Sequence, residues 1–239
     1  MTLTGPKTLS ISVIIPTLNE EGNLDRLLAR LRVQPGLDII VADGGSTDQT
    51  VACARRHGVR AVNAEAGRGS QLSCGAELAS GEVLLFLHAD TLLPDDFAAQ
   101  VHAVLALPRT AAGAFRLRID AKGAGYRCIE WGANLRSRVL GMPYGDQAIF
   151  VRNAVLQQAG GIPRQPILED LALIRRLKRL GRIRIAPAAV ATSARRWQRL
   201  GVLRTTLRNQ LLLLGALCGF SPQTLHRFYT GGLGKGGQP

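Results

Sequence analysis

The apolar run before residue 88 constrains the fold of this chain more than any other feature. Leu84-Leu-Phe-Leu87 contains no polar residue, and it stops at His88-Ala-Asp90. A continuous apolar run of this length is typical of a strand that is buried on both faces of a parallel sheet. Because parallel strands need crossover connections, the run predicts an α/β fold with helices packed on the sheet.

Strand-like and helix-like segments alternate along most of the chain. We predict strands at residues 11–15, 37–42, 59–62, 82–87, 112–119 and 148–151. We predict a helix with a buried stripe at Leu24, Leu27, Leu28 and Leu31, and further helices at 67–78, 125–140 and 171–180. Trp131 and Leu135 are expected to face the core. Strands that alternate with helices in this way predict a mostly parallel sheet.

Polar clusters follow three of the predicted strands. They are Pro16-Thr-Leu-Asn-Glu20, Asp43-Gly-Gly-Ser-Thr-Asp48 and His88-Ala-Asp90. The carboxyl ends of parallel strands share one edge of the sheet, and α/β folds bind their ligands there. The three clusters together therefore favour a ligand site at this edge.

Each cluster also has a structural interpretation. Asp43 either stabilises a strand-to-helix turn, with Ser46 or Thr47 as the helix cap, or accepts a hydrogen bond from a nucleotide base or ribose. Asp90 either caps a helix that begins near Pro94, or holds a hard cation against a phosphate group. Arg68 lies between two glycines at a predicted helix N-terminus, where a diphosphate can bind. A dinucleotide fingerprint is absent after the first strand, which argues against a nicotinamide enzyme.

The charge of the chain is distributed unevenly. The net charge is +13, and residues 171–239 hold 13 Lys and Arg but no acidic residue. This asymmetry indicates either an anionic partner, such as a diphosphate or an anionic lipid, or a solvated basic surface. Nucleic acid is not expected, because no nucleic-acid-binding motif is present. The four cysteines are widely spaced and fit free thiols in the cytoplasm, and no signal peptide or apolar membrane span is recognised.

The motifs in this order resemble the family 2 glycosyltransferases with the GT-A fold, a Rossmann-like nucleotide-binding sheet flanked by helices. The resemblance implies transfer of a sugar from a nucleotide-diphosphate sugar, with a UDP-sugar as the favoured donor. His88-Ala-Asp90 resembles the D-x-D metal motif of the family, with His in place of the first Asp. It implies Mn²⁺ or Mg²⁺ on Asp90 and leaves His88 as a second candidate ligand. The implied donor contacts are Pro16, Thr17, Glu20, Asp43, Arg68, Ala89 and Arg195.

The second half of the chain carries the implied catalytic residues. Glu169-Asp170 resembles the Glu-Asp pair of inverting members, whose Asp is the general base that takes the acceptor proton. The alternative is a pair of acidic residues at a helix N-terminus. Ser193-Ala-Arg-Arg-Trp197 resembles a shortened R-x-x-R-W element, in which Arg196 contacts the departing diphosphate and Trp197 stacks on a sugar or packs in the core.

The acceptor is a small molecule or a lipid in this interpretation. Asp146 and Gln147, in a turn-rich loop, either contact the acceptor or stabilise the loop. More narrowly, three elements resemble a compact bacterial subfamily often named for arsenosugar biosynthesis, some of whose members carry carotenoid-glycosylation names. They are His88-Ala-Asp90, Pro143-Tyr-Gly-Asp-Gln147 and Ala194-Arg-Arg-Trp197. Two other functions are weighed against this one. They are a nucleotidyltransferase that makes an activated sugar, and a catalytically silent protein that binds the membrane.

The chain divides into four predicted parts. They are an N-terminal tail at 1–10, a GT-A domain at 11–198, a basic amphipathic helical segment at 199–230 and a disordered tail at 231–239. Leu200, Leu203, Leu207, Leu211 and Leu214 are expected to form one apolar stripe of the helical segment. A basic amphipathic helix can lie in a membrane interface. We therefore consider peripheral contact through 199–220 with the inner face of the membrane.

Overall fold

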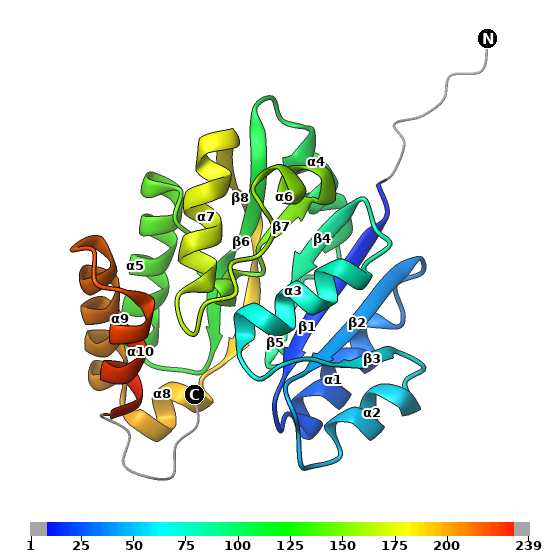
Figure 1. Cartoon of the computed structure of the whole chain (residues 1–239), viewed down its shortest axis with the longest axis horizontal. Helices are drawn as coiled ribbons and strands as arrows, with labels where there is room; N and C mark the ends of the chain where they lie inside the picture. Colours follow the sequence, from blue (N-terminus) through cyan, green and yellow to red (C-terminus); the bar gives the residue numbers. More distant parts are fainter. Residues whose placement is uncertain (1–8, 232–239) are drawn as a thin grey trace.

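A computed structural model describes residues 9–231, apart from the side chains of Arg196, Leu203, Leu217 and Thr230 (Figure 1). Most of the two predicted tails, at 1–10 and 231–239, therefore lies outside the described residues. The core is one eight-stranded sheet with the strand order β3-β2-β1-β4-β7-β6-β8-β5. The strands are β1 Ile11–Thr17, β2 Leu37–Asp43, β3 Arg60–Asn63, β4 Val83–Phe86, β5 Thr91–Leu92, β6 Thr110–Asp120, β7 Phe150–Arg152 and β8 Arg182–Ser193.

The first half of the sheet is parallel and the second half is mixed. Strands β3, β2, β1 and β4 pair in parallel, as the alternation of strands and helices predicts. Strand β7 runs antiparallel to both β4 and β6, and β5 runs antiparallel to β8. The predicted central strand is confirmed, because β4 lies between β1 and β7 and Leu84, Leu85 and Leu87 are fully buried.

Helices cover both faces of the sheet. They are α1 Glu21–Leu31, α2 Thr50–Arg56, α3 Arg68–Leu78, α4 Phe97–Ala106, α5 Ala124–Leu140, α6 Asn153–Gln158, α7 Glu169–Leu180, α8 Arg195–Leu200, α9 Val202–Leu217 and α10 Pro222–Gly231, with a 3-10 turn η1 at Gly145–Gln147. Helices α1, α2 and α4 pack on one apolar core, and α3, α6 and α7 pack on a second core. Strand β4 contributes Leu85 to the first core and Leu84 to the second, as expected for a strand buried on both faces.

The prediction that Trp131 and Leu135 face the core is wrong. Their side chains on α5 are 68% and 44% exposed. The polar side of α5 faces β6 instead: Asn134 accepts a hydrogen bond from Leu117 N at 2.8 Å and donates to Leu117 O at 3.0 Å. Strand β7 pairs with β6 only at Ala112 and Gly113, so the backbone groups of Leu117 need other hydrogen-bond partners on that side. Helix α5 supplies them through Asn134. The apolar stripe of α5 is therefore turned outward.

The predicted helical segment at 199–230 consists of three helices. Gly201 has a φ of 83° and separates α8 from α9, so the leucine stripe from Leu200 to Leu214 is interrupted. On α9, Leu207, Leu211 and Leu214 are 62%, 45% and 54% exposed. A different set of residues holds the segment to the domain, namely Leu212, Leu225 and Tyr229 packed against Ile167, Leu168 and Ala216.

Two helix caps that the sequence left open as alternatives are not formed. Helix α2 begins at Thr50, so neither Ser46 nor Thr47 caps it, and Asp48 accepts the hydrogen bond from Thr50 N at 2.9 Å. Asp90 does not cap the next helix, because α4 begins at Phe97 after a turn at Asp96. The structural alternative for Asp90 is thereby removed.

The close contact between α3 and the loop before α7 gives a stability prediction. A Cβ atom on Gly69 would lie 2.5 Å from the carbonyl oxygen of Pro163. We expect Gly69→Ala to lower the unfolding free energy by about 1–3 kcal/mol, because backbone must move to accept the methyl group. In the matched control Gly22→Ala on α1, nothing lies within 4 Å of the new Cβ, and we expect a gain of roughly 0.4–1 kcal/mol. Urea denaturation of both variants measures the difference, and equal effects would contradict the contact.

Candidate active site

The polar clusters predicted to share one edge of the sheet do meet there. Strands β1 and β2 end opposite each other at Thr17 and Asp43, and Thr17 Oγ1 donates to Asp43 Oδ1 at 3.1 Å. Gln71 of α3 ties these strand ends together, because its Nε2 donates to Thr17 O at 2.7 Å and to Ala42 O at 2.9 Å. Gln71 is not recognisable from the sequence as a site residue, since a single Gln in a helix carries no signal of its own.

Asp43 holds the turn that follows β2. Its side chain is only 2% exposed, and it accepts hydrogen bonds from Gly45 N at 3.0 Å and Ser46 N at 2.8 Å. The neighbouring loop is joined to this turn, because Asn19 Oδ1 accepts from Thr47 N at 2.8 Å. The geometry supports the turn interpretation of Asp43 directly, and contact with a nucleotide stays a prediction.

Asp90 and Glu20 form an acidic pair beside an arginine. Burial raises the pKa of the half-buried Asp90 carboxyl, and the charge of Glu20 raises it further, while Arg195 and Arg68 oppose both effects. Arg195 Nη2 donates to Glu20 Oε1 at 2.6 Å. Strand pairing brings Arg195 here, because β5 pairs with the end of β8 and Ser193 N donates to Asp90 O at 3.0 Å. Asp90, whose charge is disfavoured by burial and by Glu20, is the carboxylate here that could hold a cation.

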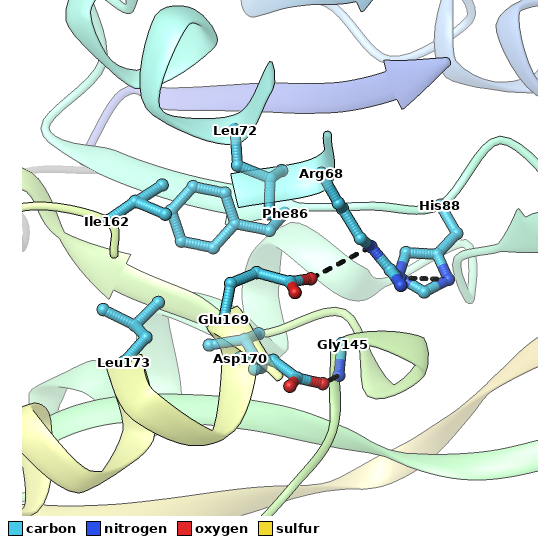
Figure 2. Close-up of a pocket in the computed structure, with 10 residues that line it drawn as sticks. Arg68, Leu72, Phe86, His88, Gly145, Ile162, Glu169, Asp170 and Leu173 are labelled. Carbon is cyan, nitrogen blue, oxygen red and sulfur yellow. Dashed lines mark hydrogen bonds and ion pairs between the residues drawn. The ribbon is translucent and has the colours of Figure 1, made fainter. Parts of the chain in front are cut away.

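Arg68 connects the His88-Ala-Asp90 segment to the Glu169-Asp170 segment (Figure 2). Its Nη2 lies 2.9 Å from His88 Nδ1, and its Nε lies 3.4 Å from Glu169 Oε1. Burial raises the pKa of the Glu169 carboxyl, Arg68 lowers it, and the neighbouring Asp170 raises it. A buried carboxylate in such a position keeps the arginine side chain in one place.

Asp170 lies in a pocket at the N-terminus of α7. Its Oδ2 accepts a hydrogen bond from Gly145 N at 2.7 Å, and its Oδ1 accepts from Leu171 N at 2.7 Å. Figure 2 shows the carboxylate facing the Gly145 loop, below Arg68 and His88. The residues that line the pocket are Arg68, Leu72, Phe86, His88, Gly145, Ile149, Ile162, Glu169, Asp170 and Leu173.

The two predicted acceptor residues lie in different surroundings. Gln147 is fully buried, accepts from Ser137 Oγ at 2.6 Å and donates to Phe115 O at 2.9 Å. These bonds hold the loop, so Gln147 reaches an acceptor only if the loop moves. Asp146 is half-buried in the same 3-10 turn. Contact of either residue with an acceptor stays a prediction.

The model of the family described as "Glycosyl transferase family 2" matches residues 12–159, which is more than half of the chain. The chain belongs to glycosyl transferase family 2. The matched part contains β1 to α6, and with them Thr17, Asp43 and Asp90, but it ends before α7.

Curated relatives of this family 2 chain match over shorter parts. The 4,4'-diaponeurosporenoate glycosyltransferase of Staphylococcus haemolyticus is 36% identical over 103 residues, which are 39% of this chain and 28% of that protein. The glucosyl-3-phosphoglycerate synthase of Mycobacterium tuberculosis is 32% identical over 97 residues, which are 36% of this chain and 30% of that protein. The chain therefore spans less than a third of the length of these relatives.

Solved structures of glycosyltransferases confirm the predicted GT-A fold. A mannosyltransferase from Pyrobaculum calidifontis, in complex with GDP-Man and Mn²⁺, has a TM-score of 0.64 at 21% identity and covers 79% of this chain and 60% of that chain. The glucosyl-3-phosphoglycerate synthase of Mycobacterium tuberculosis, in complex with Mn²⁺ and UDP-glucose, has a TM-score of 0.64 at 22% identity and covers 89% and 80%.

The residues after β8 of this family 2 chain divide between core and site. Trp197 is 8% exposed and packs with Ile119 and Ala194, so it is a core residue. Arg195 reaches Glu20, as described above. The side chain of Arg196 lies outside the described part of the structure, and its role stays a prediction.

Three potential metal ligands also meet on α1 and α2. Asp25 Oδ1 lies 2.9 Å from His57 Nε2 and 3.6 Å from Cys53 Sγ. Burial raises the pKa of the Cys53 thiol, and Asp25 raises it further, so the protonated thiol donates to the carboxylate. We interpret this group as a structural link between the two helices.

Proposed function

We propose that this chain is a metal-dependent glycosyltransferase that moves a sugar from a nucleotide-diphosphate sugar to an acceptor hydroxyl, with inversion. The observation that carries the proposal is the meeting of Asp90, Arg68, Arg195 and Asp170 at the ligand-binding edge of a GT-A sheet. Charge neutralisation and a general base are what the departure of a diphosphate and the attack of a hydroxyl require.

The donor would lie along the ends of β1, β2 and β4. We assign Pro16, Thr17, Glu20 and Asp43 to the nucleotide, and Arg68, Ala89 and Arg195 to the diphosphate. The hydrogen bonds between Asn19 and Thr47, and from Gln71 to both strand ends, support a nucleotide pocket that is organised before the donor binds. Arginine side chains here would stabilise the leaving group through charge-assisted hydrogen bonds.

The residues at this edge fit a divalent cation. Asp90 is partly desolvated and lies near Glu20, so its charge is poorly compensated by the protein alone. Asp90 would hold Mn²⁺ or Mg²⁺, with diphosphate oxygens as further ligands, as is usual for a hard cation on a nucleotide. When bound, the ion would neutralise negative charge on the diphosphate. The Mn²⁺ named in the two neighbouring structures supports this assignment.

The acceptor side is formed around Asp170. Its carboxylate would take the proton of the attacking hydroxyl, and Glu169 would keep Arg68 beside it. UDP-glucose and GDP-Man, named in the neighbouring structures, support a nucleotide sugar without fixing the base, and a UDP-sugar remains our first choice. A small molecule or a lipid remains our proposed acceptor, and the likeness to the arsenosugar-type subfamily and the cytoplasmic location stay predictions.

Nucleotide-dependent thermal stability tests the donor site. We expect UDP with Mn²⁺ at about 100 times its Kd to stabilise the fold by about 2.7 kcal/mol. In a domain of this size this raises the melting temperature by roughly 5–10 °C. EDTA is the control and should remove most of the shift. A panel of UDP, GDP, CDP and their sugars that produces no shift would contradict the proposal and favour the silent binding protein.

Membrane contact through the C-terminal helices forms a separate part of the proposal. Large exposed apolar side chains occur on α5, on α9 and α10 and in the turn between the last two, namely Trp131, Leu135, Val139, Leu140, Leu207, Leu211, Leu214, Phe220 and Phe228. Figure 1 places α9 and α10 beside α5 at one end of the molecule. Exposed Arg199 and Arg204 accompany them. No helix among residues 9–231 is long and apolar enough to cross a membrane. An anionic bilayer fits a surface that is both apolar and basic.

Vesicle sedimentation tests this contact. We expect the protein to bind vesicles with about 30% phosphatidylglycerol and to dissociate in high salt, since each basic residue near an anionic surface contributes about 1 kcal/mol. The double variant Leu207→Ser, Leu211→Ser should bind at least about tenfold more weakly. The control is Val33→Ser, because Val33 is 78% exposed after α1. Equal binding of the double variant and the control, or binding to phosphatidylcholine alone, would contradict an anionic membrane as the partner.

A further inference from the structure

The contact between Arg68 and His88 fixes the roles of the two imidazole nitrogens. A guanidinium group donates hydrogen bonds and cannot accept them. Because Arg68 Nη2 lies 2.9 Å from His88 Nδ1, Nδ1 must be the acceptor and carry no proton. A neutral imidazole has one N–H group, which is then on Nε2. In this arrangement the Nδ1 lone pair is engaged by Arg68, and Nε2 has no lone pair to offer to a metal ion.

Arg68 is held in this position from several sides. Glu169 Oε1 lies 3.4 Å from Arg68 Nε, and the Glu169 side chain is only 7% exposed. The backbone of α3 is fixed as well, because Gly69 packs directly against the carbonyl oxygen of Pro163. Turning His88 toward a metal ion would break its contact with Arg68 and leave the arginine with the buried Glu169 alone.

The Nε2 atom of His88 is near the catalytic carboxylate. A Cβ atom built on Gly145 would lie 3.1 Å from His88 Nε2, 3.3 Å from Arg68 Nη2 and 3.4 Å from Asp170 Oδ2. These short distances show that His88 Nε2, Arg68 Nη2 and Asp170 Oδ2 lie close around Gly145, and the four residues line one pocket (Figure 2). The pocket therefore offers the N–H group of His88 and a carboxylate oxygen of Asp170. This is the complement of a hydroxyl group, which accepts hydrogen bonds and donates one.

We propose that His88 is a substrate-binding residue and not a metal ligand. Arg68, supported by Glu169, holds it as the Nε2-protonated tautomer. Its Nε2–H then donates a hydrogen bond to a substrate hydroxyl oxygen in the pocket that His88 and Asp170 both line. The inference rests on the proposed glycosyl transfer and gives the segment His88-Ala-Asp90 two functions. Asp90 serves the diphosphate side and His88 serves the hydroxyl side.

Nuclear magnetic resonance of ¹⁵N-histidine-labelled protein tests the tautomer without turnover. Long-range ¹H–¹⁵N correlation distinguishes a protonated from an unprotonated ring nitrogen, and His88→Gln identifies the signals. We expect a protonated Nε2 and an unprotonated Nδ1, both unchanged when Mg²⁺ and UDP are added. Loss of the Nε2 proton on addition of Mg²⁺ would overturn the proposal, as would a protonated Nδ1 in the wild-type protein.

Metal affinity and turnover form the second test. We expect His88→Ala to lower kcat by about tenfold or more, with His88→Gln partly restoring it through its amide N–H, and both to keep the Mn²⁺ affinity within about threefold. Asp90→Asn should weaken Mn²⁺ binding by at least about tenfold. Gly145→Ala should lower kcat in the same way as His88→Ala, whereas Gly132→Ala on α5, where the new Cβ contacts nothing within 4 Å, should not.

The outcomes separate this inference from the proposed function. If the His88 variants weaken Mn²⁺ binding as much as Asp90→Asn does, His88 is a ligand and the inference is wrong while the proposed function stands. If the wild-type protein binds no nucleotide, the proposed function fails, and the tautomer measurement still decides how Arg68 holds His88. Wild-type kcat in both His88→Ala and Gly145→Ala would exclude a substrate hydroxyl bound by His88 in this pocket.

Discussion

An Asp170→Asn variant is expected to lose about 10²- to 10⁴-fold in kcat, the usual contribution of a general base. The amide oxygen of Asn can still accept the hydrogen bond that Leu171 N donates to Oδ1 at 2.7 Å, so α7 should begin as before. The NH₂ group of Asn cannot accept the bond that Gly145 N donates to Oδ2 at 2.7 Å, so the Gly145 loop loses that one hydrogen bond. The amide group has no basic lone pair at neutral pH and cannot take the acceptor proton. Nucleotide binding in the presence of Mn²⁺ should stay within about threefold of the wild-type value.

The measurement for Asp170 is a transfer assay together with nucleotide titration. The control is Asp120→Asn, since Asp120 is an exposed carboxylate at the end of β6 and its change should leave kcat and binding unaltered. Transfer at the wild-type rate by Asp170→Asn would show that another group is the base. Loss of nucleotide binding together with turnover would instead assign Asp170 to the donor site.

An Asp90→Asn variant should show the second large effect, which is on the melting temperature. Relative to the wild-type protein, we expect a higher melting temperature without metal and a lower one with Mn²⁺ and UDP. Burial and the charge of Glu20 raise the pKa of Asp90 above its ordinary value, so the ionised carboxylate is less favourable in the folded protein than in the unfolded chain. This contribution destabilises the fold as the pH rises through the raised pKa. Without metal, Asp90→Asn should therefore melt at a higher temperature than the wild-type protein at neutral pH. The two should converge as the pH falls below the raised pKa.

With Mn²⁺ and UDP bound, the wild-type protein should melt at a higher temperature than Asp90→Asn. The wild-type protein should gain roughly 5–10 °C at about 100 times the Kd, whereas Asp90→Asn should gain little, because it has lost the carboxylate that would hold the ion. Calorimetric melting of both proteins with and without ligand measures all four values. Asp38→Asn is a poor control because Asp38 accepts bonds from Ser12 and Ser80, so the exposed Asp120 again serves. An equal ligand-induced gain in both proteins would exclude Asp90 as the metal residue.

Local patterns in the sequence were sufficient to predict much of the fold. The apolar run that ends at His88 predicted the central strand, and it lies between β1 and β7 with side chains in both cores. The carboxyl-edge rule for parallel strands predicted that the segments at Thr17, Asp43 and Asp90 share one edge. The helix over 67–78 is found at Arg68–Leu78. These predictions succeed because a strand buried on both faces needs an uninterrupted apolar run, which is visible in the sequence. Parallel strands also all end at the same edge of the sheet, so the residues that follow them must lie there.

The prediction that depended on what covers a helix did not succeed. The apolar residues of α5 predicted a buried face, yet Trp131 is 68% exposed, and the leucine pattern after Trp197 left open what its stripe contacts. Apolar spacing shows that a helix has an apolar face, but it does not show what that face contacts. On α5 the open stretch of β6 required polar partners, and Asn134 supplied them from the opposite side of the helix.

The sequence by itself thus determined the α/β architecture and the sheet edge at which the residues of the candidate site meet. Only the tertiary structure decided how these residues act on one another. Arg68 joins His88 to Glu169, and the pairing of β5 with β8 places Arg195 beside Glu20. These partners are far apart in the chain, and their contacts depend on the packing of α3, α7 and β8. No local pattern records a distance between such side chains, because that distance exists only after the chain has folded.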